Sequence, residues 1–596
     1  MNVTVKAGNT TRWSRFAAVA VILVAAGVAV APQLLHGNSC GHDFDFHLIS
    51  WLDAANSWRH GIPYPHWAPS ANFGAGEARF LFYPPLTWML GAALSLVLPW
   101  TLVPIALTYL LLAATGLATR ALARQALSEG AATLAGCAAL FSGYALFTAY
   151  ERTAFGELAG GFWIPLLLLF LLRERNPSAS LARRALDGSA APLALVVAGC
   201  WLSNVPLGVM ACYLLAAVAL VAALLARSWA PVLRVALAAA LGIGLASLYL
   251  LPAVVEQKWI DIRQTTDDPS ERIENGWLFA RHADPALAAH DTVLLKVSML
   301  AASMIAVALV SLLVCRLRGT LAGGRRWWLP LALVPFAVLF LQLPVSLPLW
   351  NLLPKLRFLQ FPWRWQVVLE APMAILFASA LWPARLWRRG AVTVVCAAFF
   401  LAATAFAAHD FFQNCDDEDS VSGSLSVYRS GAGFVGADEY APPASDNTLL
   451  ASGLPDACLV TDAATVLGAL PEGHDADDAT LVWNPNQGSC EATPRWQLDL
   501  PEHKRLTATV AHTGFLILRV RSYPAWRIAV NGRLAGGLPR RDDGLIVVPV
   551  PQGPVDVALE WSTTPDLLAG GWLSALAALV LIVLWRYERR FRHPVH

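Results

Sequence analysis

The chain has 596 residues, of which 57% are hydrophobic and only 14% are charged, whereas soluble proteins carry about 25% charged residues. This composition excludes a disordered, fibrous or nucleic-acid-coating protein and argues against a wholly soluble enzyme. The net charge of +2 conceals a segregation, because residues 409–566 hold 22 acidic and 10 basic side chains. An acidic block and a basic, apolar block therefore share one chain.

Twelve apolar segments are long enough to cross a bilayer as helices. They are residues 16–35, 101–119, 131–149, 158–172, 190–205, 207–226, 233–255, 293–315, 327–345, 366–384, 391–408 and 567–586. A further run, 84–100, is bounded by prolines at both ends, and we interpret it as an interfacial or re-entrant helix. If 84–100 does not cross the membrane, the Arg-rich turns all fall on one side. Because Lys and Arg are enriched in cytoplasmic loops, this predicts that both termini are cytoplasmic.

The opposite, extracytoplasmic side then holds outer loops at 36–100 and 256–292 and the acidic block 409–566. The mixed charges of loop 256–292 are typical of a solvated surface, with a lid over a site as the alternative. Within the acidic block, alternating segments separated by Asn-Gly, Asp-Gly and Pro-Gln-Gly turns predict strands at 514–522, 526–531, 545–550 and 555–561. We therefore expect a mainly α polytopic membrane domain (1–408), a β-sandwich-like domain (409–566), and a last helix with a basic tail (567–596).

Nine cysteines divide into two groups. Five lie within or beside the apolar segments, where a thiol is a small apolar group. The other four lie outside, in a compartment that permits disulfides: Cys40, Cys415, Cys458 and Cys490. Cys458 with Cys490 is the favoured pair and Cys40 can pair with Cys415, but the sequence leaves the connectivity open.

The first outer loop begins with a dense group of ionisable side chains, running from Gly41 to His47. The surrounding aromatic and aliphatic residues favour burial, which would draw Asp43 and Asp45 into a partly desolvated site. There a carboxylate can act as a general base, or can bind a divalent cation together with His47. His42 adds a second imidazole to this group. The alternative is a solvated loop in which Asp45 caps a helix.

Three further stretches of the outer side carry candidate residues. His66 belongs to an aromatic, Gly- and Pro-rich stretch (64–85) that predicts either an interfacial aromatic belt or a platform for sugar rings. Arg152 and Glu157 occupy a turn between two apolar helices, where charged groups are functional unless they form only an internal pair.

The last stretch, residues 353–365, places three cations among aromatic side chains on the side that should be poor in Lys and Arg. Cations at an outer membrane face suit a phosphate group. The candidates here are Lys355, Arg357, Trp363, Arg364 and Trp365. The alternative is that the cations extend toward lipid headgroups.

These motifs together resemble the bacterial membrane family named 6-pyruvoyl-tetrahydropterin-synthase-related. The matching stretches are Gly41-His42-Asp43 to His47, Tyr64-Pro65-His66-Trp67 to Tyr83-Pro84-Pro85, Arg152 with Glu157, and Gln360-Phe361-Pro362-Trp363-Arg364-Trp365. That family in turn looks like the GT-C superfamily of integral-membrane glycosyltransferases, which share an acidic motif in the first outer loop and seven spans before a second large outer loop.

The resemblance implies a glycosyltransferase of the bacterial inner membrane. Its donor would be a polyprenyl-phosphate sugar, and its acceptor a glycan, a lipid or a protein. Asp43 or Asp45 would deprotonate the acceptor, with Glu157 as a further catalytic or positioning group, and the anomeric carbon would be inverted. Lys355, Arg357, Arg364 and Arg152 would stabilise the leaving phosphate. His42, His47 or His66 would position the acceptor or a metal. No cofactor is certain from the sequence, a divalent metal stays an alternative, and no nucleic acid is expected. The competing hypothesis is a non-catalytic protein that transports or assembles lipid-linked glycans, which would need polar residues through the bilayer midplane.

Overall fold

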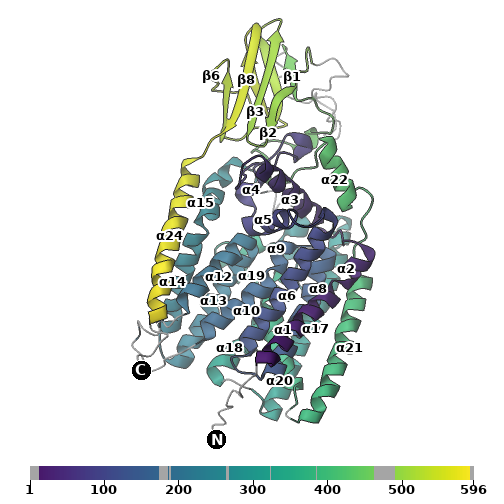
Figure 1. Cartoon of the computed structure of the whole chain (residues 1–596), viewed down its shortest axis with the longest axis vertical. Coiled ribbons are helices and arrows are strands. Elements are labelled where there is room, and N and C mark those ends of the chain that lie inside the picture. Colours follow the sequence, from purple (N-terminus) through teal and green to yellow (C-terminus); the bar gives the residue numbers. More distant parts are fainter. Residues whose placement is uncertain are drawn as a thin grey trace.

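A computed structural model describes residues 12–173, 181, 185–186, 189–263, 268–321, 324–383, 385–461 and 490–590. Part of the predicted β-rich block, 462–489, and the last residues of the basic tail, 591–596, lie outside this description. Figure 1 shows a tilted bundle of long helices with a pair of β-sheets at one end. A layer of short helices and loops separates the sheets from the bundle.

The long helices follow the predicted apolar segments closely. They are α1 (Arg12–Ala29), α6 (Val103–Ala123), α7 (Glu129–Leu140), α10 (Gly160–Leu172), α12 (Ala190–Ser203), α13 (Val205–Ala226), α14 (Ala230–Leu245), α15 (Ser247–Glu256), α17 (Ala288–Arg318), α18 (Arg325–Leu341), α20 (Gln366–Leu381), α21 (Leu386–Asp410) and α24 (Pro565–Arg590). The shorter ones are α2 (Ala31–His36), α3 (Phe44–Arg59), α4 (Arg79–Phe82), α5 (Pro85–Leu94), α8 (Gly143–Phe147), α9 (Phe155–Leu158), α19 (Leu347–Leu352) and α22 (Val421–Ser430).

The number of membrane spans is smaller by strict criteria than the sequence predicts. Within the described residues, seven helices are long and apolar enough to cross a membrane, or nine if two sharply bent helix pairs each count as one span. All twelve predicted segments are helical, but several are short or broken, so twelve spans stay a prediction. The bent pairs are α14 with α15 (73°) and α18 with α19 (95°).

The run after Pro84 forms a short helix, as the sequence indicates. Helix α5 has ten residues and therefore measures about 15 Å, half the thickness of a bilayer's hydrocarbon core. It packs against α3 and α12, and together with α3 and α4 it forms the layer between the bundle and the sheets (Figure 1). The first outer loop thus lies over the end of the bundle rather than crossing it.

The β-rich part is a sandwich of two antiparallel sheets. Its strands are β1 (Ala457–Val460), β2 (Trp496–Leu500), β3 (His503–Val510), β4 (Gly514–Arg521), β5 (Trp526–Val530), β6 (Arg533–Leu534), β7 (Leu545–Val550) and β8 (Gly553–Trp561). One sheet has the order β1-β4-β7 and the other β2-β3-β8-β5-β6. Apolar side chains from both sheets share one buried core with Trp67 and Leu81 of the first outer loop. The four strands expected from the sequence are all present.

Two disulfides form, and they join the four cysteines that lie outside the apolar segments. Cys458 bonds to Cys490 inside the β-rich part, as favoured from the sequence. Cys40 bonds to Cys415, which links the start of the first outer loop to the chain just after α21. The second pairing joins residues 375 positions apart and fixes the loop next to Asp43.

Candidate functional site

A cavity of about 670 Å³ lies between the end of the helical bundle and the β-rich part. Seven separate stretches of the chain contribute to its wall. The lining side chains that matter for chemistry are His42, Asp43, Tyr83, Arg152, Glu271, His290, Gln360, Phe361, Trp363, Arg364, Glu439 and Tyr440. Candidate residues from the first outer loop, from the turn 150–157 and from the stretch 353–365 therefore meet in one place.

Backbone contacts fix the loop that carries Asp43 against the turn that carries Arg152. The amide of Asp43 donates to the carbonyl of Arg152 at 2.9 Å, and the amide of His42 donates to the carbonyl of Glu151 at 3.3 Å. Gly41 makes this approach feasible, since a Cβ there would lie 2.3 Å from the carbonyl oxygen of Glu151. Only glycine allows the two segments to lie this close.

The charged centre of the cavity is a chain of four alternating charges. Arg152 Nη2 is 3.2 Å from Asp43 Oδ2, and Arg152 Nη1 is 3.0 Å from Glu157 Oε2. Arg364 Nε lies 3.3 Å from the same Glu157 oxygen, and the hydroxyl of Tyr144 donates to the other. Glu157 is 3% exposed and Asp43 36% exposed. Glu157 therefore contacts both guanidinium groups from the buried side, whereas Asp43 is the acid of this chain that is accessible from the cavity.

Aromatic rings hold Arg364 on its second side. Its guanidinium lies 5.0 Å from the ring centre of Phe361, which stacks on Trp363 at 4.3 Å. Its Nη1 donates to Gln360 Oε1 at 2.9 Å, and Gln360 adopts a left-handed backbone (φ +60°) that non-glycine residues rarely adopt. A strained residue of this kind is common at sites that must hold a side chain in one position.

Two acids that the sequence did not single out also line the cavity. Glu271 of the second outer loop accepts from Gln360 Nε2 at 2.8 Å, and burial raises its pKa above the ordinary value. Burial also raises the pKa of Glu439 to about 7, with the carboxylates of Glu77 and Glu271 adding to the shift. Glu439 comes from the acidic block some 400 residues after Asp43, and no local pattern marks it. For Glu271, the mixed charge of loop 256–292 was the one feature of the sequence that indicated a role at a site.

Other candidates from the first outer loop lie outside this cavity. Asp45 is exposed in the first turn of α3. His47 is buried beside Phe155, with ring centres 5.1 Å apart, and burial lowers its pKa to about 4, so its ring is neutral at pH 7. His66 contacts the β-rich part, where its Nδ1 lies 3.0 Å from Glu502 Oε1.

The candidates of the stretch 353–365 divide in the same way. Trp363 and Arg364 line the cavity, whereas Lys355, Arg357 and Trp365 do not. Lys355 is exposed and its Nζ lies 4.4 Å from the ring centre of Phe358. Arg357 pairs with Glu274 at 2.7 Å on the surface, and Trp365 is buried in the core.

No group of three or more His, Cys, Asp or Glu side chains with metal-binding geometry occurs among the residues that the structure describes. The closest pairing in the second outer loop is His282 with Asp291, whose Nδ1 and Oδ1 are 2.6 Å apart. Two ligands are fewer than the four of a structural zinc site.

Comparisons with known proteins add a limited amount. No family model and no curated protein sequence matches the chain, so the resemblance to the 6-pyruvoyl-tetrahydropterin-synthase-related family is not supported. Among solved structures, the chain is similar to the arabinofuranosyltransferase AftD from Mycobacteria (19% identity, TM-score 0.41, covering 67% of this chain and 27% of AftD). It is also similar to the archaeal oligosaccharyltransferase AglB from Archaeoglobus fulgidus (13% identity, TM-score 0.41, covering 73% of this chain and 61% of AglB).

The chain thus spans about a quarter of AftD and less than two thirds of AglB. Both matched proteins are glycosyl-transferring enzymes by name. With TM-scores of 0.41, these similarities do not assign a role to any residue. The interpretation of the site rests on the geometry of the cavity.

Proposed function

We propose that the chain is an integral membrane glycosyltransferase of the GT-C type. It would transfer a sugar from a polyprenyl-phosphate donor to a glycan, lipid or protein acceptor on the extracytoplasmic side of a bacterial inner membrane, with both termini cytoplasmic. The observation that supports this most is the meeting of Asp43, Arg152 and Arg364 around one cavity at the end of an apolar helical bundle.

Asp43 is the proposed general base. It is the carboxylate of the charged chain that faces the open side of the cavity, whereas Glu157 lies behind the two arginines. In the reaction, the proton of an acceptor hydroxyl would pass to Asp43 as the hydroxyl oxygen forms a bond to the anomeric carbon. The bond from that carbon to the phosphate oxygen would break on the opposite face, which inverts the configuration.

Arg152 and Arg364 are the proposed stabilisers of the leaving phosphate. Two buried guanidinium groups share the Glu157 carboxylate, at 3.0 and 3.3 Å. Once Asp43 has taken the acceptor's proton, this group of side chains would carry a net positive charge where the phosphate gains negative charge. Phe361 and Trp363 line the cavity beside Arg364, and apolar surroundings strengthen such an interaction. We assign Glu157 a positioning role, since it orients both arginines and lies too deep to reach a substrate.

The experiment that tests this function uses the purified chain in lipid nanodiscs with a panel of radiolabelled polyprenyl-phosphate sugars. We expect transfer from at least one donor, and a loss of about 100- to 1,000-fold in kcat/KM for Arg364→Gln. Arg357→Gln is the matched control, because Arg357 lies in the same stretch but pairs with Glu274 on the surface. Equal activity of both variants would contradict the proposed role of the cavity.

A further inference from the structure

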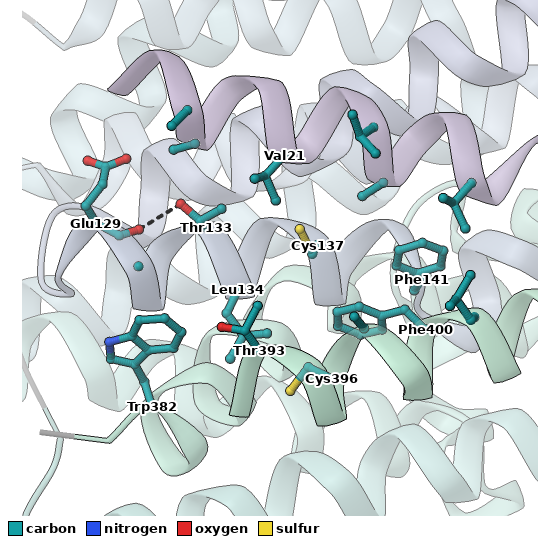
Figure 2. A pocket seen from close by; sticks show the side chains of 18 of the residues that line it. Val21, Glu129, Thr133, Leu134, Cys137, Phe141, Trp382, Thr393, Cys396 and Phe400 are labelled. Carbon is teal, nitrogen blue, oxygen red and sulfur yellow. Dashed lines mark hydrogen bonds between the residues drawn. The ribbon is translucent and has the colours of Figure 1, made fainter. Parts of the chain in front are cut away.

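A second, entirely different cavity lies inside the membrane domain, between α1, α7 and α21. It measures about 480 Å³ and is lined almost wholly by apolar groups, among them Ala18, Cys137 and Cys396. Figure 2 shows Glu129 and Trp382 at one end of this groove, and Phe141 and Phe400 at the other. Helix α21 is only 22% buried along its apolar stretch, so most of its surface is not covered by the rest of the protein.

The depth of the groove corresponds to one leaflet of a bilayer. On α7 it extends from Glu129 to Phe141, which is about 18 Å at 1.5 Å per residue. Half of a hydrocarbon core is about 15 Å. The inner end is closed by Phe141 and Phe400, whose rings stack at 4.8 Å. A chain entering from the open end therefore stops near the midplane.

The open end of the groove carries positive charge. Trp382 follows the end of α20, at the side of the bundle away from the cavity that holds Arg364. The guanidinium of Arg389 lies 5.8 Å from the Trp382 ring centre. Arg385 and Arg388 are both exposed at the start of α21.

Glu129, the one acid among the described residues that line the groove, does not offset that charge. Glu129 Oε2 lies 3.0 Å from Arg124 Nε, and its other carboxylate oxygen pairs with Arg120. The rim is therefore cationic while the groove is apolar, and a tryptophan lies between the two regions, as is common at the boundary of a bilayer.

We propose that this groove binds an anionic glycerophospholipid from the leaflet opposite the β-sheets. One acyl chain would lie between α1 and α21, and the phosphate would lie at Arg385 and Arg388, because basic rims between membrane helices recognise anionic headgroups. This site is separate from the proposed transferase cavity and does not depend on its function.

The first test compares lipids by native mass spectrometry of the full chain released from nanodiscs that contain phosphatidylglycerol or phosphatidylcholine. We expect retained phosphatidylglycerol, and roughly 30-fold weaker retention in the double variant Arg385→Gln, Arg388→Gln, since each basic residue contributes a roughly fivefold factor. The double variant Arg316→Gln, Arg325→Gln removes two exposed cations elsewhere at the same side and should retain the lipid. Equal retention of phosphatidylcholine would overturn the proposal.

The second test fills the groove. Ala397 lines it and the adjacent Ala398 does not, so Ala397→Phe should displace the acyl chain whereas Ala398→Phe should leave it bound. Both residues are exposed, and an unchanged gel-filtration profile would show that each variant is folded. Retention of phosphatidylglycerol by Ala397→Phe at the wild-type level would overturn the assignment of the acyl chain to this groove.

Discussion

Replacing Glu157 with Gln tests whether one buried carboxylate holds the two arginines of the cavity. The change preserves shape but removes the charge that faces Arg152 at 3.0 Å and Arg364 at 3.3 Å. Breaking a buried ion pair by removing one partner costs about 3–5 kcal/mol, because the remaining charge stays buried without compensation. We therefore expect a folded variant with a clearly lower melting midpoint and severely reduced sugar transfer.

The matched control is Glu274→Gln, which breaks an ion pair of similar length but with both partners more than 40% exposed. Such surface pairs contribute about 0–1 kcal/mol, so this variant should melt close to wild type. Intrinsic tryptophan fluorescence during heating measures both midpoints in the same nanodiscs. Adding Arg364→Gln to Glu157→Gln should recover part of the loss, since it removes an uncompensated charge, with a coupling of about 1–3 kcal/mol. If Glu157→Gln and Glu274→Gln melted alike, the account of the buried charges would be refuted.

Two further predictions concern stability. Asp53 is fully buried, and burial raises its pKa from an ordinary 3.8 to about 6. Its contribution to the free energy of unfolding is therefore full below about pH 4 and falls by about 3 kcal/mol as pH rises through 6. The melting midpoint of the wild type should fall over this interval, while that of Asp53→Asn should change less. Parallel pH profiles of the two proteins would contradict this. Replacing Cys40 and Cys415 with Ser should cost about 2–4 kcal/mol and also reduce transfer, because Cys40 precedes Asp43 by three residues. Serines at Cys458 and Cys490 should lower the melting midpoint with little loss of transfer, and an equal loss of transfer in both variants would argue against a link between the first disulfide and the site.

Much of the fold could be predicted from the sequence, because the bilayer and the β-sheet impose simple patterns. Long apolar runs predict helices, and Val-, Ile-, Leu- and Arg-rich segments between turn residues around 514–561 predict strands of the sandwich. The prolines around 84–100 correctly indicate a short helix over the bundle. The exact number of spans was harder to predict, since bends such as the 95° turn between α18 and α19 do not change mean hydropathy.

Several residues of the site could be predicted from the sequence, but their positions relative to one another could not. Charged groups beside apolar helices mark Asp43, Arg152 and Arg364, because burying them unpaired is costly. Sequence alone does not distinguish Asp43 from Asp45, since which of the two faces the cavity depends on where α3 begins, at Phe44. Glu439 lines the same cavity only because the fold brings distant parts of the chain together. No pattern in the sequence around Glu439 predicts this proximity.

The most direct measurement compares Asp43→Asn with Asp45→Asn in the transfer assay, using properly folded protein in nanodiscs. Both changes remove one carboxylate from neighbouring positions of the same loop, but only Asp43 lines the cavity and contacts Arg152. Loss of a general base should reduce kcat by about 100- to 10,000-fold in Asp43→Asn and leave Asp45→Asn near wild type. Full transfer by Asp43→Asn would contradict the central claim that this carboxylate accepts the acceptor's proton.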